Sequence, residues 1–548
     1  MPVLALDAGT TSTRAMVFAD DGSVLGRAQR PFQQHFPRDG WVEHDAEEIF
    51  RTTIACAREA IAASGVTPSA IAGIGIAVQR ETVVVWDRTT SVPVHRAIVW
   101  QDRRTADACR ALAADPAAEG LVTRTGLLLD PYFSATKLAW ILDNVEGARD
   151  AAARGRLLAG TIDCWLLWRL TGGAVHATDA TNASRTLLFD IRRQAWSAEL
   201  CDLFRVPGEL LPVVRDSADD YGRTLPELLG AAIPVRAMVG DQQSAAVGQD
   251  CVAPGQAKAT YGTGCFVLVH TGDTPRVSRH RLLTTVALRL EGQPTFALEG
   301  SIFNAGSVVQ WLRDQLGLVA TAAETATLAA SVASTNGVYC VPAFTGLGAP
   351  WWDPEARGAL LGLTRDSGRA EIVRAALEAV AFQTRDLATA FADDGVSLAA
   401  LRVDGGMAAN DWLMQTLADQ LRVAVERPTV LETTAWGAAR LAGLHAGIYP
   451  PLGAPGLRRV ERIFEPTGSA ADADRLHAGW LRAVERVRSS VLTVRGSRIT
   501  VHAASSDSRN ASVPSGPVTS STSAPPPGVR SIRKSRKAQQ RFSSCSTA

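Results

Sequence analysis

Two strand-like hairpins with glycine-rich turns constrain the fold of this chain more than any other feature. In the first, the polar turn at residues 7–11 separates the apolar runs 3–6 and 14–18, which have the length and character of paired strands. In the second, the glycine-rich turn 261–264 again lies between two apolar runs. The second segment therefore resembles the first hairpin.

Helical patterns alternate with the strand-like runs. Asp45, with a glutamate three residues later, resembles a capping box, and apolar residues then recur near helical spacing until Gly65. A further helix is expected after Asp102. More strand-like runs lie at 71–78, 83–86 and 98–100. Because strands and helices alternate, the sequence predicts a layered α/β fold.

The domain organisation is predicted from the chain length and from the positions of glycine, proline and composition changes. A chain of 548 residues exceeds one ordinary core. Glycine and proline cluster at 248–255, between the two hairpins, so we expect an N-terminal domain over 1–250 and a C-terminal domain over 251–488. From about residue 489 the composition changes to Ser, Thr, Pro and Arg, which predicts a disordered tail over 489–548.

Composition excludes several classes of partner. The net charge of +1 gives no general attraction to nucleic acid or anionic lipid. No stretch approaches the roughly 20 apolar residues that span a bilayer, and Asp7 interrupts the first apolar run before a signal-peptide core could form. The eight cysteines are scattered singly, without paired metal-ligand spacing. We therefore expect a cytoplasmic protein with reduced thiols, no nucleic-acid partner and no membrane span.

Any use of ATP must proceed without the usual phosphate-binding lysine loop. Before the predicted tail, lysine occurs only at Lys137 and Lys258, and neither follows the required glycine pattern. Backbone amides and hydroxyls on a Gly/Thr turn can cradle phosphates instead, and the segment 7–14 supplies both. The alternative is an ordinary polar β-turn.

Two clusters of polar residues suit a polyol substrate. Arg80 and Glu81 stand between two strand-like runs, where a guanidinium and a carboxylate could clamp hydroxyls; the alternative is a surface ion pair. Trp100 is either core or the wall of a pocket. Asp241 follows the apolar run 235–239, at the end of a strand, where it could accept a hydroxyl proton. The alternative for Asp241 is a helix N-cap.

Taken together, these clusters resemble those of the FGGY carbohydrate kinases along nearly all of residues 3–487. The two family patterns are matched at 132–144 and at 358–378. Within the family, the segments that resemble the members that phosphorylate glycerol are 40–45, 79–82, 181–186 and 240–243. The resemblance implies two actin-like, ribonuclease-H-like domains around a cleft that holds ATP and substrate, and transfer of the γ-phosphate of ATP to glycerol.

The resemblance also implies a role for individual residues. Asp241 would be the general base. The residues implied to bind glycerol are Arg80, Glu81, Trp100, Tyr132, Asp241, Gln242 and Phe266. Those implied to bind ATP are Thr10, Thr11, Ser12, Arg14, Thr263, Gly306, Gln310, Gly406 and Asn410. Asp7 would help to place Mg²⁺, and the enzyme would be a homo-oligomer, a dimer or a tetramer.

Two alternatives compete with this interpretation. A kinase for a longer polyol or sugar, such as xylulose or gluconate, would share most of these motifs, but the paired aromatic residues Trp100 and Phe266 favour a three-carbon chain. An ATP-binding scaffold without catalytic activity would not require Asp241, which is present.

Overall fold

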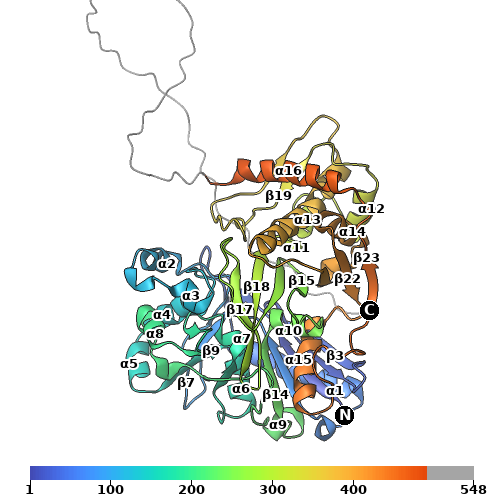
Figure 1. The fold of residues 1–548 in the computed structure, drawn as a ribbon. Helices are drawn as coiled ribbons and strands as arrows, with labels where there is room; N and C mark the ends of the chain where they lie inside the picture. The colour runs from blue at the N-terminus through green and yellow to red at the C-terminus, as the bar shows by residue number, and fades with distance from the viewer. Residues whose placement is uncertain (490–548) are drawn as a thin grey trace, which may run out of the picture. The chain divides into compact units, whose positions relative to one another are not determined.

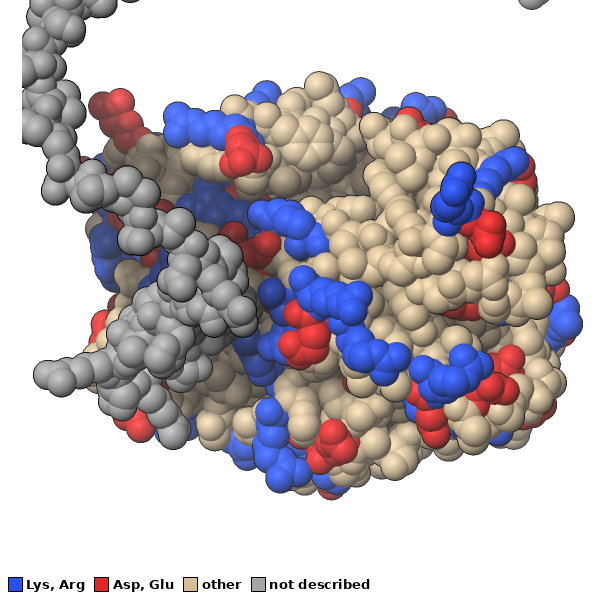
Figure 2. All heavy atoms as spheres, turned by 90° about the horizontal axis from the view of Figure 1, so that it is seen from above, with Lys and Arg blue, Asp and Glu red and all other residues tan. Residues whose placement is uncertain are grey.

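The computed structural model describes residues 1–489. The predicted tail lies outside the described residues, except for its first residue, Ser489. Within residues 1–489, no helix has the length and apolar character needed to cross a membrane. On the face drawn in Figure 2, basic and acidic side chains are interspersed, as the near-zero net charge suggests.

The first sheet contains the first predicted hairpin. Its strand order is β14-β6-β1-β2-β3, with bounds Val235–Gly240, Ile74–Val78, Val3–Ala8, Ser12–Phe18 and Val24–Pro31. β1 pairs with β2 in antiparallel register and with β6 in parallel register, and β6 also pairs with β14 in parallel register. Because β1, β6 and β14 run parallel, the turn at 7–11 and the residues after β14 lie at the same, carboxyl end of these strands. Figure 1 shows β14 and helix α10 (Asp241–Gly248), which begins directly after it in the chain.

Helix α1 (Ala46–Ser64) packs on β2 and β3 of this sheet. Asp45 is its N-cap and accepts hydrogen bonds from the backbone N–H groups of Glu47 and Glu48, as expected. The capping box is only half formed, because the Glu48 carboxylate accepts from the backbone of Gln33 instead. Gly65 ends the helix at φ 68°, a left-handed conformation that glycine adopts without strain.

The second sheet repeats this arrangement. Its order is β17-β18-β16-β15-β21-β22-β23, with bounds Leu283–Leu290, Gln293–Ile302, Cys265–Gly272, Ala257–Tyr261, Ala400–Asp404, Ala424–Pro428 and Val460–Phe464. β15 and β16 form the second predicted hairpin, and β15 pairs with β21 in parallel register, as β1 does with β6. The alternation of strands and helices thus gives the predicted α/β fold.

A third sheet was not predicted. Its order is β4-β5-β8-β7-β9, with bounds Gln34–His35, Glu43–His44, Ala97–Ile98, Val83–Asp87 and Leu157–Thr161. The predicted strand at 98–100 is shorter, because Trp100 already lies in a turn. The helix expected after Asp102 is α2 (Ala106–Ala113).

Helix α15 (Thr433–His445) connects the late part of the chain to the first sheet. It packs on α10 (Asp241–Gly248) and on β1, β6 and β14, where Trp436 and Leu441 share a buried apolar cluster with Phe18. The two helices approach so closely that a Cβ on Gly437 would come within 1.8 Å of the Ser244 carbonyl oxygen. A segment beyond the expected boundary at 250 therefore completes the core of the first sheet.

Candidate active site

Asp241 is the first residue of α10, directly after β14. Gly240 occupies the N-cap position, so capping does not account for the aspartate. The Asp241 side chain is 25% exposed, and its Oδ1 lies 3.3 Å from Nε of Arg80. Two residues that the sequence predicts to bind substrate thus meet at one edge of the first sheet, and the carboxylate is accessible to a ligand.

Arg80 is buried, and its fork faces a partner that the sequence did not reveal. Its Nη1 and Nη2 donate to the two carboxylate oxygens of Glu299 at 2.5 and 3.1 Å, and Nη1 also donates to Oε1 of Gln243 at 3.2 Å. The guanidinium therefore pairs with a carboxylate on β18, 219 residues away in the chain. The sequence signal that could have pointed to Glu299 is that it is the one charged residue in the otherwise uncharged strand segment 296–302.

A second arginine closes this group into a ring. Arg185 donates from Nε to Glu81 Oε1 at 2.6 Å and from Nη2 to Glu299 Oε1 at 2.9 Å. Burial alone would raise the pKa of Glu299, but Arg185 and Arg80 outweigh burial and hold this pKa at about 2. We call Arg80, Glu81, Arg185 and Glu299 the charge tetrad.

The backbone at Glu81 is strained. Its φ is 61°, in the left-handed region that costs a side-chain-bearing residue roughly 1–2 kcal/mol. Ser134 Oγ and Lys137 Nζ donate to the Glu81 carbonyl oxygen at 3.1 and 3.3 Å. Lys137 Nζ also donates to the carbonyl oxygen of Tyr132 at 2.6 Å. Ser134 and Lys137, from the segment 132–144, thus fix the backbone of Glu81, and Lys137 also fixes that of Tyr132.

Three predicted aromatic residues lie together beside the tetrad. The ring centroid of Trp100 is 5.5 Å from that of Tyr132 and 5.9 Å from that of Phe266, in edge-to-face arrangements. The Arg80 guanidinium lies 5.9 Å from the Phe266 ring. The indole Nε1 of Trp100 donates to Thr10 Oγ1 at 2.9 Å, which places the predicted phosphate turn next to the aromatic group.

The predicted metal residue, Asp7, lies on β1 near other acids. Burial, together with the negative charges of Asp241 and Glu432, raises the pKa of Asp7 to about 6 despite the opposing effect of Arg14. Arg14 Nη1 lies 3.6 Å from Asp7 Oδ2. No group of three or more His, Cys, Asp or Glu within residues 1–489 has the arrangement of a metal centre. A partly buried carboxylate beside other acids still suits Mg²⁺, which keeps several waters and phosphate oxygens as ligands.

Three of the backbone segments that carry predicted ATP residues pack closely against one another. Thr263 accepts hydrogen bonds at its carbonyl oxygen from the backbone of Ala305 and Ser307, both at 3.0 Å. A Cβ on Gly306 would come within 2.5 Å of the Gly262 carbonyl oxygen, and one on Gly405 within 2.5 Å of the Tyr261 carbonyl oxygen. Glycine is therefore required where these segments meet.

The remaining predicted ATP residues differ in exposure. Gly406 and Gln310 are exposed, the latter on α11 (Gly306–Asp314), and Thr11 is exposed on the first turn. Asn410 is the N-cap of α14 (Asp411–Leu421) and donates from Nδ2 to Thr325. Ser12 and Arg14 on β2 both contact Gln29 of β3.

Lys258 on β15 is a residue that the sequence did not assign to the site. Its Nζ is buried and donates to Oε1 of Gln242 and to Oγ1 of Thr260. Burial lowers the pKa of Lys258, although Asp404 and Asp241 oppose this shift. Gln242, predicted to bind substrate, is thereby fixed by a lysine from the second sheet.

Comparison with known proteins places the chain in a family. Residues 2–248 match the N-terminal domain, and residues 257–446 the C-terminal domain, of the FGGY family of carbohydrate kinases. The chain belongs to that family. The predicted resemblance and the two-domain fold around an ATP cleft are confirmed.

Several relatives of this FGGY kinase carry a more specific name. A glycerol kinase from Rhodospirillum centenum is 58% identical over 488 residues, which cover 89% of this chain and 98% of the relative. One from Ectopseudomonas mendocina is 58% identical over 490 residues, with 89% and 99% covered. The crystal structure of Plasmodium falciparum glycerol kinase with ADP matches with a TM-score of 0.83 at 35% identity and covers 89% and 98% of the two chains.

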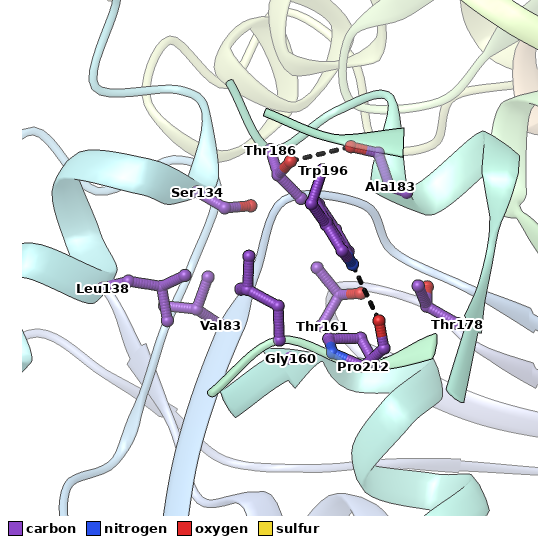
Figure 3. Close-up of a pocket in the computed structure, with 11 residues that line it drawn as sticks. Val83, Ser134, Leu138, Gly160, Thr161, Thr178, Ala183, Thr186, Trp196 and Pro212 are labelled. Carbon is purple, nitrogen blue, oxygen red and sulfur yellow. Dashed lines mark hydrogen bonds between the residues drawn. The ribbon is translucent and has the colours of Figure 1, made fainter. Parts of the chain in front are cut away.

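A small pocket in this FGGY kinase is lined in part by Ser134, which also donates to the Glu81 carbonyl oxygen. Figure 3 shows Thr161, Thr178 and Trp196 around it, with the Trp196 indole donating to the Pro212 carbonyl oxygen at 2.7 Å. Its wall is mostly apolar and includes Val83 and Leu138. Since it contains none of the predicted site residues, we assign it to packing behind the third sheet.

Proposed function

We propose that this FGGY kinase transfers the γ-phosphate of ATP to a terminal hydroxyl of glycerol and gives sn-glycerol 3-phosphate and ADP. The observation that carries the proposal is the meeting of Asp241 and Arg80 with the aromatic group of Trp100, Tyr132 and Phe266. A carboxylate and a guanidinium can bind hydroxyls, while aromatic walls contact the carbon chain. The glycerol kinases of 58% identity support the same substrate.

Asp241 is the proposed general base. In-line transfer needs an acceptor hydroxyl that loses its proton as its oxygen bonds to phosphorus. The Asp241 carboxylate is accessible, and the neighbouring Arg80 orients it. The proton of the terminal hydroxyl would pass to Asp241, the new bond would form to the γ-phosphorus, and ADP would leave with the electrons of the broken bond. Glu81, Tyr132 and Gln242 would hold the remaining hydroxyls.

Backbone groups and side-chain hydroxyls would bind the phosphates of ATP. Thr10, Thr11, Ser12 and Arg14 would face the phosphates from the first hairpin, and Thr263 would face them from the second. Gly306, Gln310, Gly406 and Asn410 would complete the nucleotide site. Mg²⁺, when bound, would neutralise charge on the phosphates, and Asp7 would hold it, directly or through water.

A longer substrate is the alternative that needs testing. A xylulose kinase from Rhodospirillum rubrum has a TM-score of 0.78 at 25% identity, so the fold does not distinguish the substrates. The test is ADP release by the purified full chain with glycerol, xylulose, gluconate or no acceptor. We expect release that depends on glycerol. Equal rates with all acceptors, or with none, would contradict the proposal.

Two further expectations follow from the family. We expect a homo-oligomer, a dimer or a tetramer, and light scattering of the purified chain would give its mass. We also expect a cytoplasmic enzyme, which fractionation of the source cells would test.

A further inference from the structure

We propose that Glu299 and Arg185 are a positioning pair that fixes Arg80 and Glu81 in the orientation needed to bind the polyol. This inference rests on the proposed function and names two residues beyond the predicted site. Glu299 is on β18 in the second sheet, and Arg185 follows the short helix α7 (Ala180–Ala183). Neither is accessible to solvent, so neither is assigned a contact with substrate.

The number of donors on Arg80 supports a positioning role for Glu299. A guanidinium has five N–H groups. Three of them donate to Glu299 and Gln243, and Nε faces Asp241. Among the described residues, one N–H group on Nη2 then remains for a substrate hydroxyl. Because Glu299 engages both ends of the fork, it decides where that remaining donor points.

Arg185 does the same for Glu81. Its Nε donates to Glu81 Oε1, while Glu81 Oε2 has no hydrogen-bond partner in the described part of the chain. The Arg185 guanidinium lies 5.6 Å from the Tyr132 ring and 5.4 Å from the Phe133 ring, which limits its own rotation. Arg185 therefore leaves one carboxylate oxygen of Glu81 for the substrate and fixes its direction.

The charge of the tetrad explains why both members are needed. Two arginines and two glutamates alternate, and all four side chains are at most 2% exposed. Removing one carboxylate leaves a buried positive charge without its partner, which is strongly destabilising. The remaining side chains would rearrange to reduce this cost, and the rearrangement would move the two groups that face the polyol.

The decisive variant is Glu299→Gln, measured by steady-state kinetics in both substrates and by thermal unfolding. We expect the glycerol KM to rise by at least about tenfold, while the ATP KM changes by less than about threefold. If Glu299 had only a structural role, the variant would have a lower melting temperature without this difference between the glycerol KM and the ATP KM. A glycerol KM within about threefold of the parent would overturn the inference.

A matched control is Glu378→Gln on α13 (Arg369–Asp393). Glu378 is also a buried glutamate paired with an arginine, since Arg374 Nε donates to its Oε1 at 2.8 Å. Within residues 1–489, its side chain forms no hydrogen bond or ion pair with a predicted site residue. We expect a lower melting temperature and an unchanged glycerol KM. A glycerol KM that rises as much as in Glu299→Gln would overturn the inference, because loss of any buried ion pair would then suffice.

Should Glu299→Gln fail to fold, Arg185→Lys tests the same pair with the charge retained. A lysine cannot span Glu81 and Glu299 as the guanidinium does. We expect the same split between the two KM values, and an unchanged glycerol KM would overturn the inference. The parent enzyme separates the two proposals: if it releases no ADP with glycerol, the proposed function fails, whereas an active parent with an unaffected variant contradicts only the positioning pair.

Discussion

Asp241 combines an accessible carboxylate with a neighbouring guanidinium at 3.3 Å, and its replacement by asparagine separates proton transfer from binding. The asparagine amide could still accept a hydrogen bond from a hydroxyl, but it could not take the proton. We expect Asp241→Asn to lose kcat by about 10²- to 10⁴-fold and to retain glycerol binding. A coupled assay and calorimetry measure the two effects.

The control for this variant is Asp250→Asn. Asp250 is likewise paired with an arginine, with its Oδ1 2.7 Å from Nη1 of Arg440, and it lies outside the predicted site. We expect Asp250→Asn to leave kcat nearly unchanged. If Asp241→Asn kept more than about a third of the parent kcat, Asp241 would be a substrate ligand and not the base.

Asp7 predicts a pH dependence. Its pKa of about 6 means that the carboxylate is charged above this pH and protonated below it. A protonated carboxyl does not bind Mg²⁺, so we expect the kcat/KM for ATP to fall as the pH drops through about 6. Excess Mg²⁺ should move the fall to lower pH, because the metal competes with the proton. If excess Mg²⁺ does not change the pH at which kcat/KM falls, the fall is due to a group other than Asp7.

Short motifs carry the predicted site residues, whereas the residues that the sequence did not assign are brought together only by the fold. Arg80 and Asp241 follow the ends of the neighbouring parallel strands β6 and β14, and strand ends can be recognised in a sequence. Glu299 and Lys258 lie within strands of the second sheet, and nothing in their local sequence indicates what they face. Contacts between residues so far apart in the chain can be identified only from the tertiary structure.

At the scale of elements, the contact between the second hairpin and α11 depends on glycine. Gly306→Ala would place a methyl group 2.5 Å from the Gly262 carbonyl oxygen and push the two segments apart. Since both are predicted to bind ATP, we expect a raised ATP KM with glycerol binding much less affected. Gly208→Ala is the control, because a Cβ there meets no atom within 4 Å. An unchanged ATP KM in Gly306→Ala would place the nucleotide elsewhere.

The elements themselves were largely predictable. Both hairpins and helix α1 follow from local patterns of apolar residues and turns. Two strands of the third sheet, β7 and β8, overlap the predicted runs 83–86 and 98–100. The sheet itself was not predictable, because β4, β5 and β8 have only two residues each and pair only through the fold. Half of the expected capping box is missing for a similar reason, since Gln33 from another segment takes the Glu48 carboxylate.

At the scale of the molecule, α15 makes the first half of the chain depend on the second. The apolar face formed by Val3, Phe18 and Val239 is covered by α15. A fragment of residues 1–250 would expose this face, and exposed apolar area of that kind promotes aggregation. We expect the fragment to aggregate or to unfold without cooperativity, whereas residues 1–489 should unfold cooperatively. Circular dichroism and size-exclusion chromatography test this, and a monomeric, cooperatively folding fragment would contradict it.

The charge tetrad also restricts how this pocket could evolve. Because each member neutralises its neighbours in a buried ring, a single change at Arg80 or Glu81 leaves an uncompensated charge. A new substrate preference that needs a different residue at either position would have to pass through a poorly stable intermediate, or begin with a compensating change at Glu299 or Arg185. Inherited changes at these four positions should therefore occur together, and libraries that vary them singly should yield few active enzymes.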